Sequence, residues 1–275
     1  MTTNHNYFLD LAFQLAAKNL GNTTLNPSVG SIIVKNGSVI SSGVTSLNGR
    51  PHSEFNALNK LKDCSGASLY TTLEPCTHYG KTPPCVNIII KKRIKFVYYA
   101  FRDPDIRTYQ KAKKILNSKG IKTKLVPSKK FYNFYKSYFW NKKHSASYVA
   151  AKIAISSDYL TINKKNKWIT NFSSRNLAHL LRNKYDSILS TSKSINNDNS
   201  LLNCRINGLN NNKPDLFIVD MKLKLKKKLL LNSLLKKRKT YLITKKINAK
   251  KSLVYKKLGY KIILIDQLND KNDFN

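Results

Sequence analysis

Apolar and polar residues recur along this chain with two periods, one typical of helices and one typical of strands. In the first half the helices are expected over residues 7–20, from Pro51 onward, and over residues 85–90 and 109–118. Short apolar runs between turn residues predict the strands, which are residues 31–34, 39–40, 67–72, 96–100 and 121–126. This alternation of strands and helices predicts an α/β domain with a layered sheet.

A second α/β pattern begins at Tyr148, with a helix expected over residues 173–182 and an asparagine-rich loop over residues 196–212. Its expected strands are residues 149–155, 187–189, 216–219, 241–243 and 262–265, of which the last three read as buried. Residues 222–239 mix leucine and lysine in blocks, which favours a solvated basic helix or loop over a membrane-surface helix. Residues 129–145 are aromatic and basic and are expected to pack against the first domain and close it. We therefore expect two domains, over residues 1–145 and 146–275.

Two of the four cysteines lie close together in a setting typical of a metal site. Cys76 and Cys85 each follow a proline, and His52 lies upstream at the expected start of a helix. A catalytic zinc needs three protein ligands and an open position for water, and one imidazole with two thiolates would supply them. Cys64 and Cys204 lack such a context and are expected to be packing residues.

Glu54 lies two positions after His52, close enough to reach a zinc-bound water without being a ligand. From there it can take a proton from the water and deliver it to a leaving amine. The zinc deaminase signature pairs H-x-E with P-C-x-x-C, and here the second half is stretched, with eight residues between the cysteines. Glutamate occurs only at Glu54 and Glu74, so neither is expected to be surface filler. A lone H-x-E or a pair of buried cysteines would be weak evidence, but together they predict a deaminase site.

The net charge of +36 is spread evenly along the chain. Residues 1–145 carry 23 Lys and Arg against 6 Asp and Glu, and residues 146–275 carry 27 against 8. Because no single patch collects this charge, and Asn, Lys and Ile are abundant throughout, we attribute it to a composition bias and expect only non-specific binding to nucleic acid. No apolar run reaches membrane-spanning length and no basic-then-apolar leader precedes the first helix, so a cytoplasmic location without membrane contact is expected.

The motifs of the first half resemble those of the bifunctional riboflavin-biosynthesis deaminase–reductase family. The matching segments are residues 26–30, 49–54 and 72–85, and the long loop between the cysteines is typical of this family. The resemblance implies a cytidine-deaminase-like three-layer α/β/α domain with zinc at the ends of two helices. It implies hydrolytic deamination of 2,5-diamino-6-ribosylamino-4(3H)-pyrimidinone 5′-phosphate, a small phosphorylated pyrimidine. The residues that fall on the family's substrate-binding positions are Asn26, His78, Lys81 and Asp103, and Lys81 would meet the phosphate.

The chain departs from the family pattern around the expected substrate. Thr45 stands where the family usually has a substrate-contacting histidine, and Asp105 stands where asparagine is usual. Residues 106–110 replace the glycines that commonly follow that loop. These departures bear on substrate detail and leave the expected zinc site intact.

The second half resembles the start of the family's reductase, which implies a dihydrofolate-reductase-like α/β fold and NADPH. Residues 151–158 and 167–170 carry the resemblance, whereas Tyr159 and Ser200 depart from it. The residues on matching positions are Lys152, Asp158, Trp168, Thr170, Arg182, Asn199 and Arg205. No glycine-rich loop for cofactor phosphates is found before Asn275, whereas the family's reductase continues further. We therefore expect a shortened reductase that binds NADPH poorly, with a homo-oligomer possible.

Three alternatives stay open from the sequence. The chain could be a fully bifunctional deaminase and NADPH reductase, and its charge leaves room for a nucleic-acid deaminase. The long loop between the cysteines argues against the latter. A non-catalytic, zinc-stabilised basic scaffold would fit Thr45 and Asp105, but the intact Glu54 argues against it.

Overall fold

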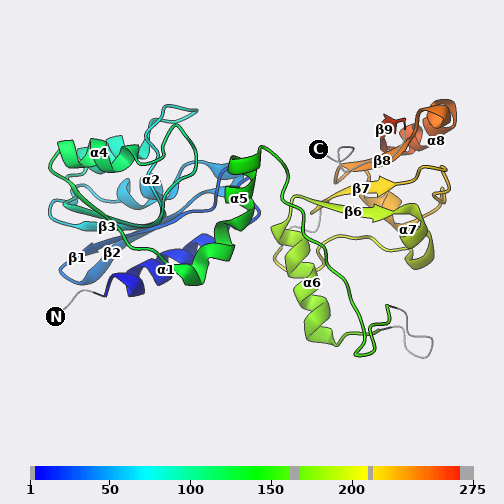
Figure 1. Ribbon diagram of the computed structural model, residues 1–275, viewed down its shortest axis with the longest axis horizontal. Helices are drawn as coiled ribbons and strands as arrows, with labels where there is room; N and C mark the ends of the chain where they lie inside the picture. Colours follow the sequence, from blue (N-terminus) through cyan, green and yellow to red (C-terminus); the bar gives the residue numbers. More distant parts are fainter. Residues whose placement is uncertain (1–3, 162–167, 210–212, 267–275) are drawn as a thin grey trace. The chain divides into compact units, whose positions relative to one another are not determined.

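The computed structural model describes residues 4–161, 168–209 and 213–266. The chain divides into two compact units, Met1–Val149 and Ala150–Asn275, and each is described by itself (Figure 1). No helix in these described ranges is long and apolar enough to cross a membrane.

The first unit is built on a five-stranded sheet in the order β2-β1-β3-β4-β5. Its strands are β1 (Gly30–Lys35), β2 (Ser38–Val44), β3 (Ser68–Leu73), β4 (Phe96–Phe101) and β5 (Lys122–Leu125). β1 runs antiparallel to both β2 and β3, whereas β3, β4 and β5 are parallel. The parallel part requires crossover connections, and helices supply them.

Helices cover both faces of this sheet, which gives three layers (Figure 1). On one face lie α2 (Ser53–Leu58), α3 (Cys85–Lys91) and α4 (Lys111–Ser118), and on the other lie α1 (His5–Ala17) and α5 (Tyr132–His144). Short 3-10 turns, η1 (Leu47–Gly49) and η2 (Lys129–Phe131), precede α2 and α5. Adjacent strand residues point to opposite layers: Leu69 packs with α2, α3 and α4, and Tyr70 packs with α1.

The aromatic segment before the second unit forms α5, and it closes the α1 face as expected. Phe13 of α1 stacks on Phe131 with ring centroids 4.0 Å apart. Tyr135 is buried, and its hydroxyl bonds to Thr72 Oγ1 at 2.6 Å and donates to the Ser28 carbonyl at 3.0 Å. Most aromatic residues of this segment therefore pack against the core of the first unit, as predicted, whereas Tyr132 and Trp140 are exposed.

The expected elements of the first unit are present, with shifted ends. The helix expected from Pro51 begins at Ser53, so His52 is its N-cap residue and not part of its first turn. The helix expected over residues 109–118 begins at Lys111, because Gln110 has a left-handed backbone with φ of 57°. A Cβ at Gly43 of β2 would lie 2.3 Å from the Ser53 carbonyl oxygen, so only glycine lets α2 lie this close to the sheet.

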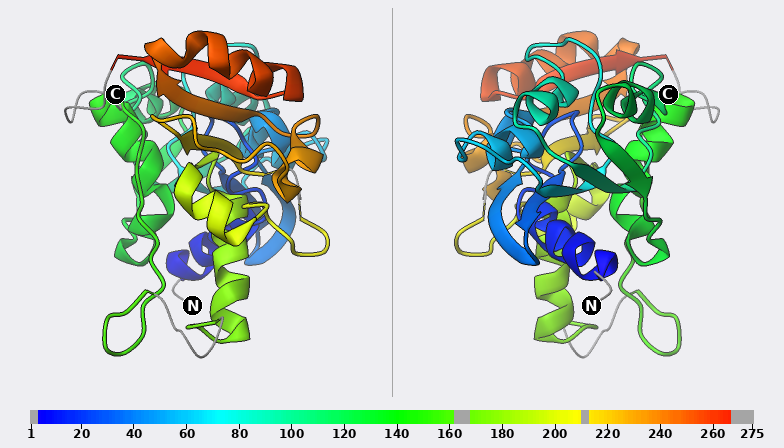
Figure 2. Two further views of the ribbon diagram at one scale, coloured as in Figure 1. Left: turned by 90° about the vertical axis from the view of Figure 1, so that its right-hand side faces the viewer. Right: turned by 90° about the vertical axis from the view of Figure 1, so that its left-hand side faces the viewer.

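The second unit contains an all-parallel sheet in the order β6-β7-β8-β9. Its strands are β6 (Ser187–Thr191), β7 (Asp215–Val219), β8 (Thr240–Lys245) and β9 (Lys261–Ile265). Its helices are α6 (Phe172–Lys184), α7 (Ser192–Asp198) and α8 (Ala249–Leu258), with 3-10 turns η3 (Leu230–Leu234) and η4 (Lys246–Asn248). Figures 1 and 2 both show α8 beside β9. Leu216, Ile218 and Leu242 point to the buried face, whereas Phe217 and Tyr241 stack on the other face at 4.4 Å.

Several expectations for the second unit are wrong. Residues 149–155 form no strand, because this segment pairs with no neighbouring strand in the described chain. The loop expected over residues 196–212 begins later, since α7 continues to Asp198; residues 210–212 lie outside the described chain. β9 is a strand as expected but has no buried residue. The expected helix and the other three strands are present.

The lysine–leucine segment over residues 222–239 is mainly loop, which is one of the two solvated forms expected for it. Its lysines are exposed, whereas Leu225, Leu229 and Leu231 pack into the core of the second unit. The leucines therefore anchor the loop to the sheet, which the sequence pattern did not indicate.

Candidate zinc and substrate site

Three potential metal ligands meet in the first unit. The ligand atoms of His52, Cys76 and Cys85 all lie within 4.8 Å of one another. Both sulfur atoms lie 3.5 Å from Nδ1 of His52, so this nitrogen is the one that faces the metal position. One imidazole nitrogen and two thiolates are a donor set that zinc prefers, and three protein ligands leave a fourth position for water. The donor set therefore fits zinc.

The start of two helices positions these ligands. His52 caps α2, and Cys85 is the first residue of α3. The first backbone N–H groups of a helix lack partners within the helix. Here the N–H of Cys85 donates to Cys76 Sγ at 3.2 Å, and the N–H of Val86 donates to the Cys76 carbonyl at 3.3 Å. The α3 terminus thus holds Cys76, which follows the end of β3.

The cysteine pair carries unequal proton affinities before a metal binds. Hydrogen bonds from Cys85 and from His52 lower the pKa of the Cys76 thiol to about 4. For Cys85, the hydrogen bond with Cys76 raises the pKa of the thiol, and burial raises it further. Burial lowers the pKa of His52, but Cys76 and Glu54 outweigh it and raise that pKa. One thiolate is therefore present already, and a bound cation would favour loss of the second thiol proton.

Glu54 lies in the first turn of α2, next to the ligands and 4% exposed. Ser53 Oγ donates to Glu54 Oε2 at 3.0 Å, and Ser53 in turn bonds to Ser31 of β1 at 2.8 Å. Burial raises the pKa of this carboxyl, which brings its proton affinity closer to that needed for proton transfer at neutral pH. The arrangement suits a group that holds a proton between two steps.

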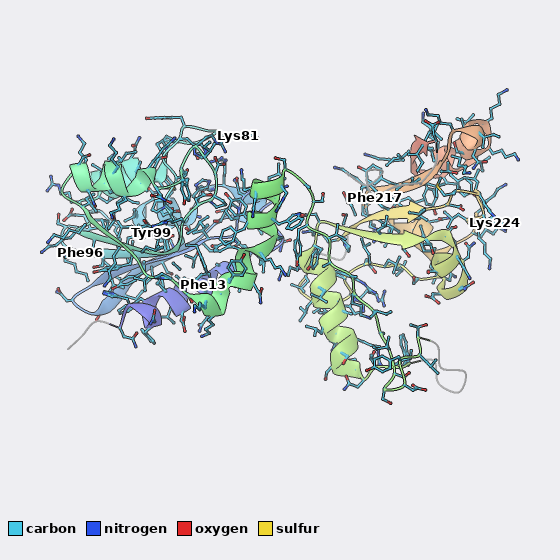
Figure 3. The ribbon with its side chains drawn as sticks, viewed as in Figure 1. Phe13, Lys81, Phe96, Tyr99, Phe217 and Lys224 are labelled. Carbon is cyan, nitrogen blue, oxygen red and sulfur yellow. The ribbon has the colours of Figure 1, made fainter. Side chains whose placement is uncertain are left out.

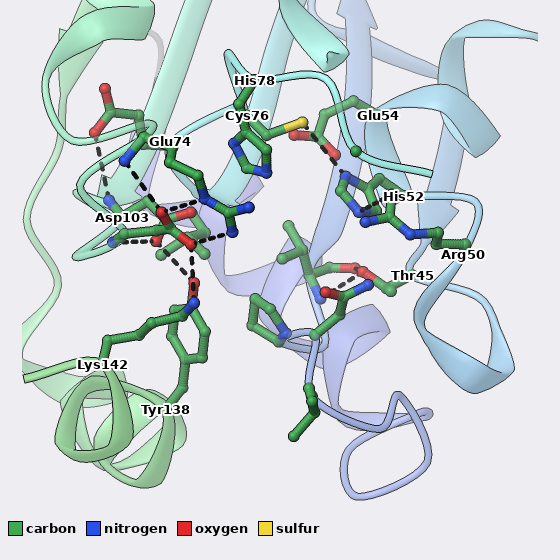
Figure 4. Close-up of a pocket in the computed structure, with 18 residues that line it drawn as sticks. Thr45, Arg50, His52, Glu54, Glu74, Cys76, His78, Asp103, Tyr138 and Lys142 are labelled. Carbon is green, nitrogen blue, oxygen red and sulfur yellow. Dashed lines mark hydrogen bonds and ion pairs between the residues drawn. The ribbon is translucent and has the colours of Figure 1, made fainter. Parts of the chain in front are cut away.

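A pocket opens beside these residues, and most of the expected substrate residues line it (Figure 4). Asn26, His78 and Asp103 are among its lining residues, together with His52, Glu54 and Cys76. Lys81 is exposed and is not one of the lining residues; Figure 3 shows it on the loop at the edge of the first unit. The structure therefore gathers the expected site residues with the exception of Lys81.

The two positions that depart from the family pattern both line the pocket. The Thr45 hydroxyl accepts a hydrogen bond from the N–H of Val29 at 2.9 Å, so it is engaged with the backbone. Asp105 is paired with Arg107 and Lys142. Thr45 thus offers the pocket a small side chain in place of an imidazole, and Asp105 is neutralised within the pocket wall.

Glu74 connects the end of β3, next to Cys76, to the loop that contains Asp103, although its rarity in the sequence did not define this role. Glu74 lies two positions before Cys76, and its carboxylate is buried. The carboxylate accepts N–H groups from Asp103 at 3.3 Å, Gln110 at 3.2 Å and Ala112 at 3.3 Å. Through these bonds, the loop that contains Asp103 and the start of α4 are fixed relative to the end of β3.

The sequence analysis missed other pocket residues. Arg50 lies within residues 49–54, and its Nη1 is 3.2 Å from His52 Nε2 and donates to Thr82 Oγ1 at 2.6 Å. Tyr138 donates to Asp103 Oδ1 at 2.8 Å. Lys142 carries no sequence signal, because it is one of many lysines and reaches the pocket only through the path of α5.

In the second unit, the structure brings together two of the seven reductase-like candidates. Arg182 Nη1 lies 3.3 Å from His179 Nδ1 and donates to the Asn203 carbonyl at 3.2 Å. The backbone N–H of Arg205 reaches the same His179 nitrogen at 3.2 Å. This gives a small cationic group at the side of α6.

The other candidates lie apart from this group. Lys152 and Asp158 are exposed on the segment before α6, and Asn199 accepts the N–H of Leu230 at 2.9 Å. The Arg175 guanidinium lies over the Trp168 ring at 4.6 Å and donates to the Thr170 carbonyl at 2.6 Å. Lys167, at the start of the second matching segment, lies outside the described residues. Cys64 and Cys204 are buried, as expected of packing residues.

Comparison with known proteins places both units in one family. Residues 2–101 match the cytidine and deoxycytidylate deaminase zinc-binding region, and residues 147–269 match the RibD C-terminal domain. A riboflavin biosynthesis protein RibD from Aquifex aeolicus is 33% identical over 96% of this chain and 75% of its own length. The chain belongs to the RibD family. The family and the fold class expected from the sequence are thus confirmed: a zinc-binding deaminase domain precedes a RibD C-terminal domain.

Other members of the RibD family match with similar identity. The proteins from Haemophilus influenzae and Buchnera aphidicola are 35% and 36% identical over 72% and 76% of this chain. These alignments span only 54% and 58% of the two relatives, little more than half of their length.

Solved RibD structures have the same architecture. RibD from Acinetobacter baumannii aligns with a TM-score of 0.82 at 26% identity, over 96% of this chain and 74% of that one. A diaminohydroxyphosphoribosylaminopyrimidine deaminase/5-amino-6-(5-phosphoribosylamino)uracil reductase from Thermotoga maritima aligns with a TM-score of 0.77 at 27% identity. That alignment covers 95% of this chain and 80% of the Thermotoga chain.

The ligand assignment predicts how cysteine variants change the metal content. Cys76→Ser and Cys85→Ser should each lose most of the bound zinc, because the site then lacks one of its three protein ligands. Cys64→Ser and Cys204→Ser are matched controls and should keep about one zinc per chain. Elemental analysis of the purified proteins measures this. Full zinc content in Cys76→Ser, or its loss in Cys64→Ser, would show that the ligands are assigned incorrectly.

Proposed function

We propose that the first unit deaminates 2,5-diamino-6-ribosylamino-4(3H)-pyrimidinone 5′-phosphate by hydrolysis, in riboflavin biosynthesis. The observation that carries this proposal is the buried Glu54 beside the three potential zinc ligands, at the wall of a pocket. Membership of the RibD family supports the choice of substrate. The Thermotoga protein, a diaminohydroxyphosphoribosylaminopyrimidine deaminase as well as a reductase by its name, supports the same deamination.

The residues of the pocket have distinct tasks in this proposal. His52, Cys76 and Cys85 would hold zinc, which when bound lowers the pKa of a coordinated water toward neutrality. Glu54 takes a proton from the attacking water as the oxygen bonds to the carbon that carries the 2-amino group, and it passes this proton to the ring nitrogen of the C=N bond that opens. The carboxylate then takes the remaining hydroxyl proton and gives it to the amine, which leaves as ammonia while the carbonyl forms.

The substrate is oriented by groups around the pocket. Asn26 Nδ2 donates to the Gly49 carbonyl at 2.9 Å, which leaves its amide oxygen available for an N–H of the pyrimidine ring. His78 is held by Thr108 at 3.2 Å, and Asp103 by Tyr138. Both lie on the loops that Glu74 and Thr77 tie together, so the substrate-binding wall is preorganised.

The second unit has the fold of the RibD C-terminal domain, for which NADPH is the implied cofactor. In this unit, Arg182 and Arg205 form a cationic group that suits a phosphate of the substrate. We propose that the reductase step is impaired or absent, because Tyr159 and Ser200 depart from the family's reductase pattern.

Glu54→Gln tests the proposed mechanism. The amide preserves the shape of the side chain but cannot carry the proton, so turnover should fall by about a hundredfold or more while zinc is retained. Ammonia release from the pyrimidine phosphate measures the first effect, and elemental analysis measures the second. An equally active Glu54→Gln protein with full zinc content would exclude Glu54 as the proton carrier.

The reductase proposal is tested on the same preparation by following NADPH oxidation separately from ammonia release. We expect ammonia release without matching NADPH oxidation, together with weak NADPH binding by calorimetry. Micromolar NADPH affinity accompanied by reduction of the ribose would instead establish a fully bifunctional enzyme.

A further inference from the structure

Three charged residues meet at the side of the pocket away from the metal ligands. Asp105 and Arg107 lie in the loop after β4, and Lys142 lies in the last turn of α5. All three line the pocket, and we refer to them as the Asp105 triad. Figure 4 shows Lys142 across the pocket from His52 and Glu54.

The Asp105 triad has one carboxylate shared by two cations. Arg107 grips both oxygens of Asp105, with Nε 2.9 Å from Oδ1 and Nη2 2.6 Å from Oδ2. Lys142 Nζ donates to the same Oδ2 at 2.8 Å. The side chain of Asp105 is 9% exposed, whereas Lys142 is 29% and Arg107 56% exposed. Within the triad, a single positive charge is therefore left over.

The two cations keep hydrogen-bond donors free for a ligand. A guanidinium has five N–H donors and an ammonium has three. The bonds to the Asp105 carboxylate use two of the Arg107 donors and one of the Lys142 donors. Among the described residues, no other acceptor for these side-chain donors is found. The carboxylate thus fixes the position of both cations and leaves some of their N–H donors available for a ligand.

The neighbouring acid does not cancel the remaining charge by direct pairing. Asp103 Oδ1 accepts the backbone N–H of Asp105 at 2.9 Å and the Tyr138 hydroxyl at 2.8 Å. In the described chain Asp103 forms no ion pair with Arg107 or Lys142. Burial raises the pKa of Asp103, and the nearby Lys142 opposes this shift.

The other lysines and arginines are poorly placed for an anion at this side of the pocket. Apart from Arg107 and Lys142, Arg50 is the only Lys or Arg that lines the pocket in the described chain. It contacts His52 and Thr82 at the metal end. Lys81 is exposed and does not line the pocket.

We propose that Arg107 and Lys142, held in place by Asp105, bind the 5′-phosphate of the substrate. The inference rests on the proposed function, because it takes its ligand from that reaction. With the 2-amino group placed at Glu54, the ribosyl phosphate on position 6 can reach the far side of the pocket, which Arg107 and Lys142 line. A phosphate there receives charge-assisted hydrogen bonds from a planar guanidinium and an ammonium. The assignment places phosphate selectivity in the triad and not in Lys81.

The test compares two substrates on the zinc-loaded full chain: the ribosylaminopyrimidine 5′-phosphate and its dephosphorylated counterpart. Arg107→Gln and Lys142→Met should each lower kcat/KM for the phosphate at least about tenfold, as expected for a lost charge-assisted bond. The value for the dephosphorylated substrate should change little. Lys142→Arg, which keeps the charge, should retain most of the preference for phosphate.

Lys143→Met is the matched control, since Lys143 is an exposed neighbour on α5 that does not line the pocket. It should behave as the unmodified protein. Equal losses on both substrates for the triad variants would show a purely structural role and overturn the proposal. Unchanged selectivity in these variants, with selectivity lost in Lys81→Met, would overturn it in favour of Lys81.

Failure of the proposed function can be told apart from failure of this inference. If neither pyrimidine releases ammonia, the deaminase proposal fails, and calorimetric titration with inorganic phosphate then tests the triad directly. Weaker phosphate binding by Arg107→Gln and Lys142→Met than by Lys143→Met would support an anion site. Equal binding by all three variants would overturn it.

Discussion

A zinc site requires its donors around one point, and here those donors come from distant parts of the chain. His52 and Cys85 lie 33 positions apart, and each marks the start of a helix on the same face of the sheet. The packing of α2 on Gly43, the end of β3 and the α3 terminus together determine where the three ligand atoms lie. The same packing buries Glu54 beside them. The reaction chemistry of the first unit depends on this convergence.

The side of the pocket away from the metal ligands depends on a second anchor. Glu74 follows β3 and accepts three N–H groups of the chain between Asp103 and Ala112. Since Cys76 is only two residues away, the end of one strand fixes both Cys76 and the loop that contains Asp103. The Asp105 triad lies on that loop and on α5, so its ion pairs also tie the last helix of the unit to the pocket.

The sequence predicted the cluster of His52, Cys76, Cys85 and Glu54 because these residue types are chemically restrictive, scarce in this chain and set in recognisable motifs. Most elements of the first unit followed from hydrophobic periodicity, which is a local signal. Lys142 and Tyr138 could not be found in this way, since lysine and tyrosine are abundant in this chain and no motif marks the two residues that contact Asp105 and Asp103. Only the packing of α5 brings them to the pocket. The strand expected over residues 149–155 does not form, because an apolar run becomes a strand only when another strand pairs with it.

One zinc held by His52, Cys76 and Cys85, with a position left for water, underlies the chemistry proposed for the first unit. X-ray absorption at the zinc edge of the purified protein tests this arrangement. We expect two sulfur atoms at about 2.3 Å and two nitrogen or oxygen atoms at about 2.0–2.1 Å from the zinc. A shell of four sulfur atoms, or a shell without sulfur, would contradict it.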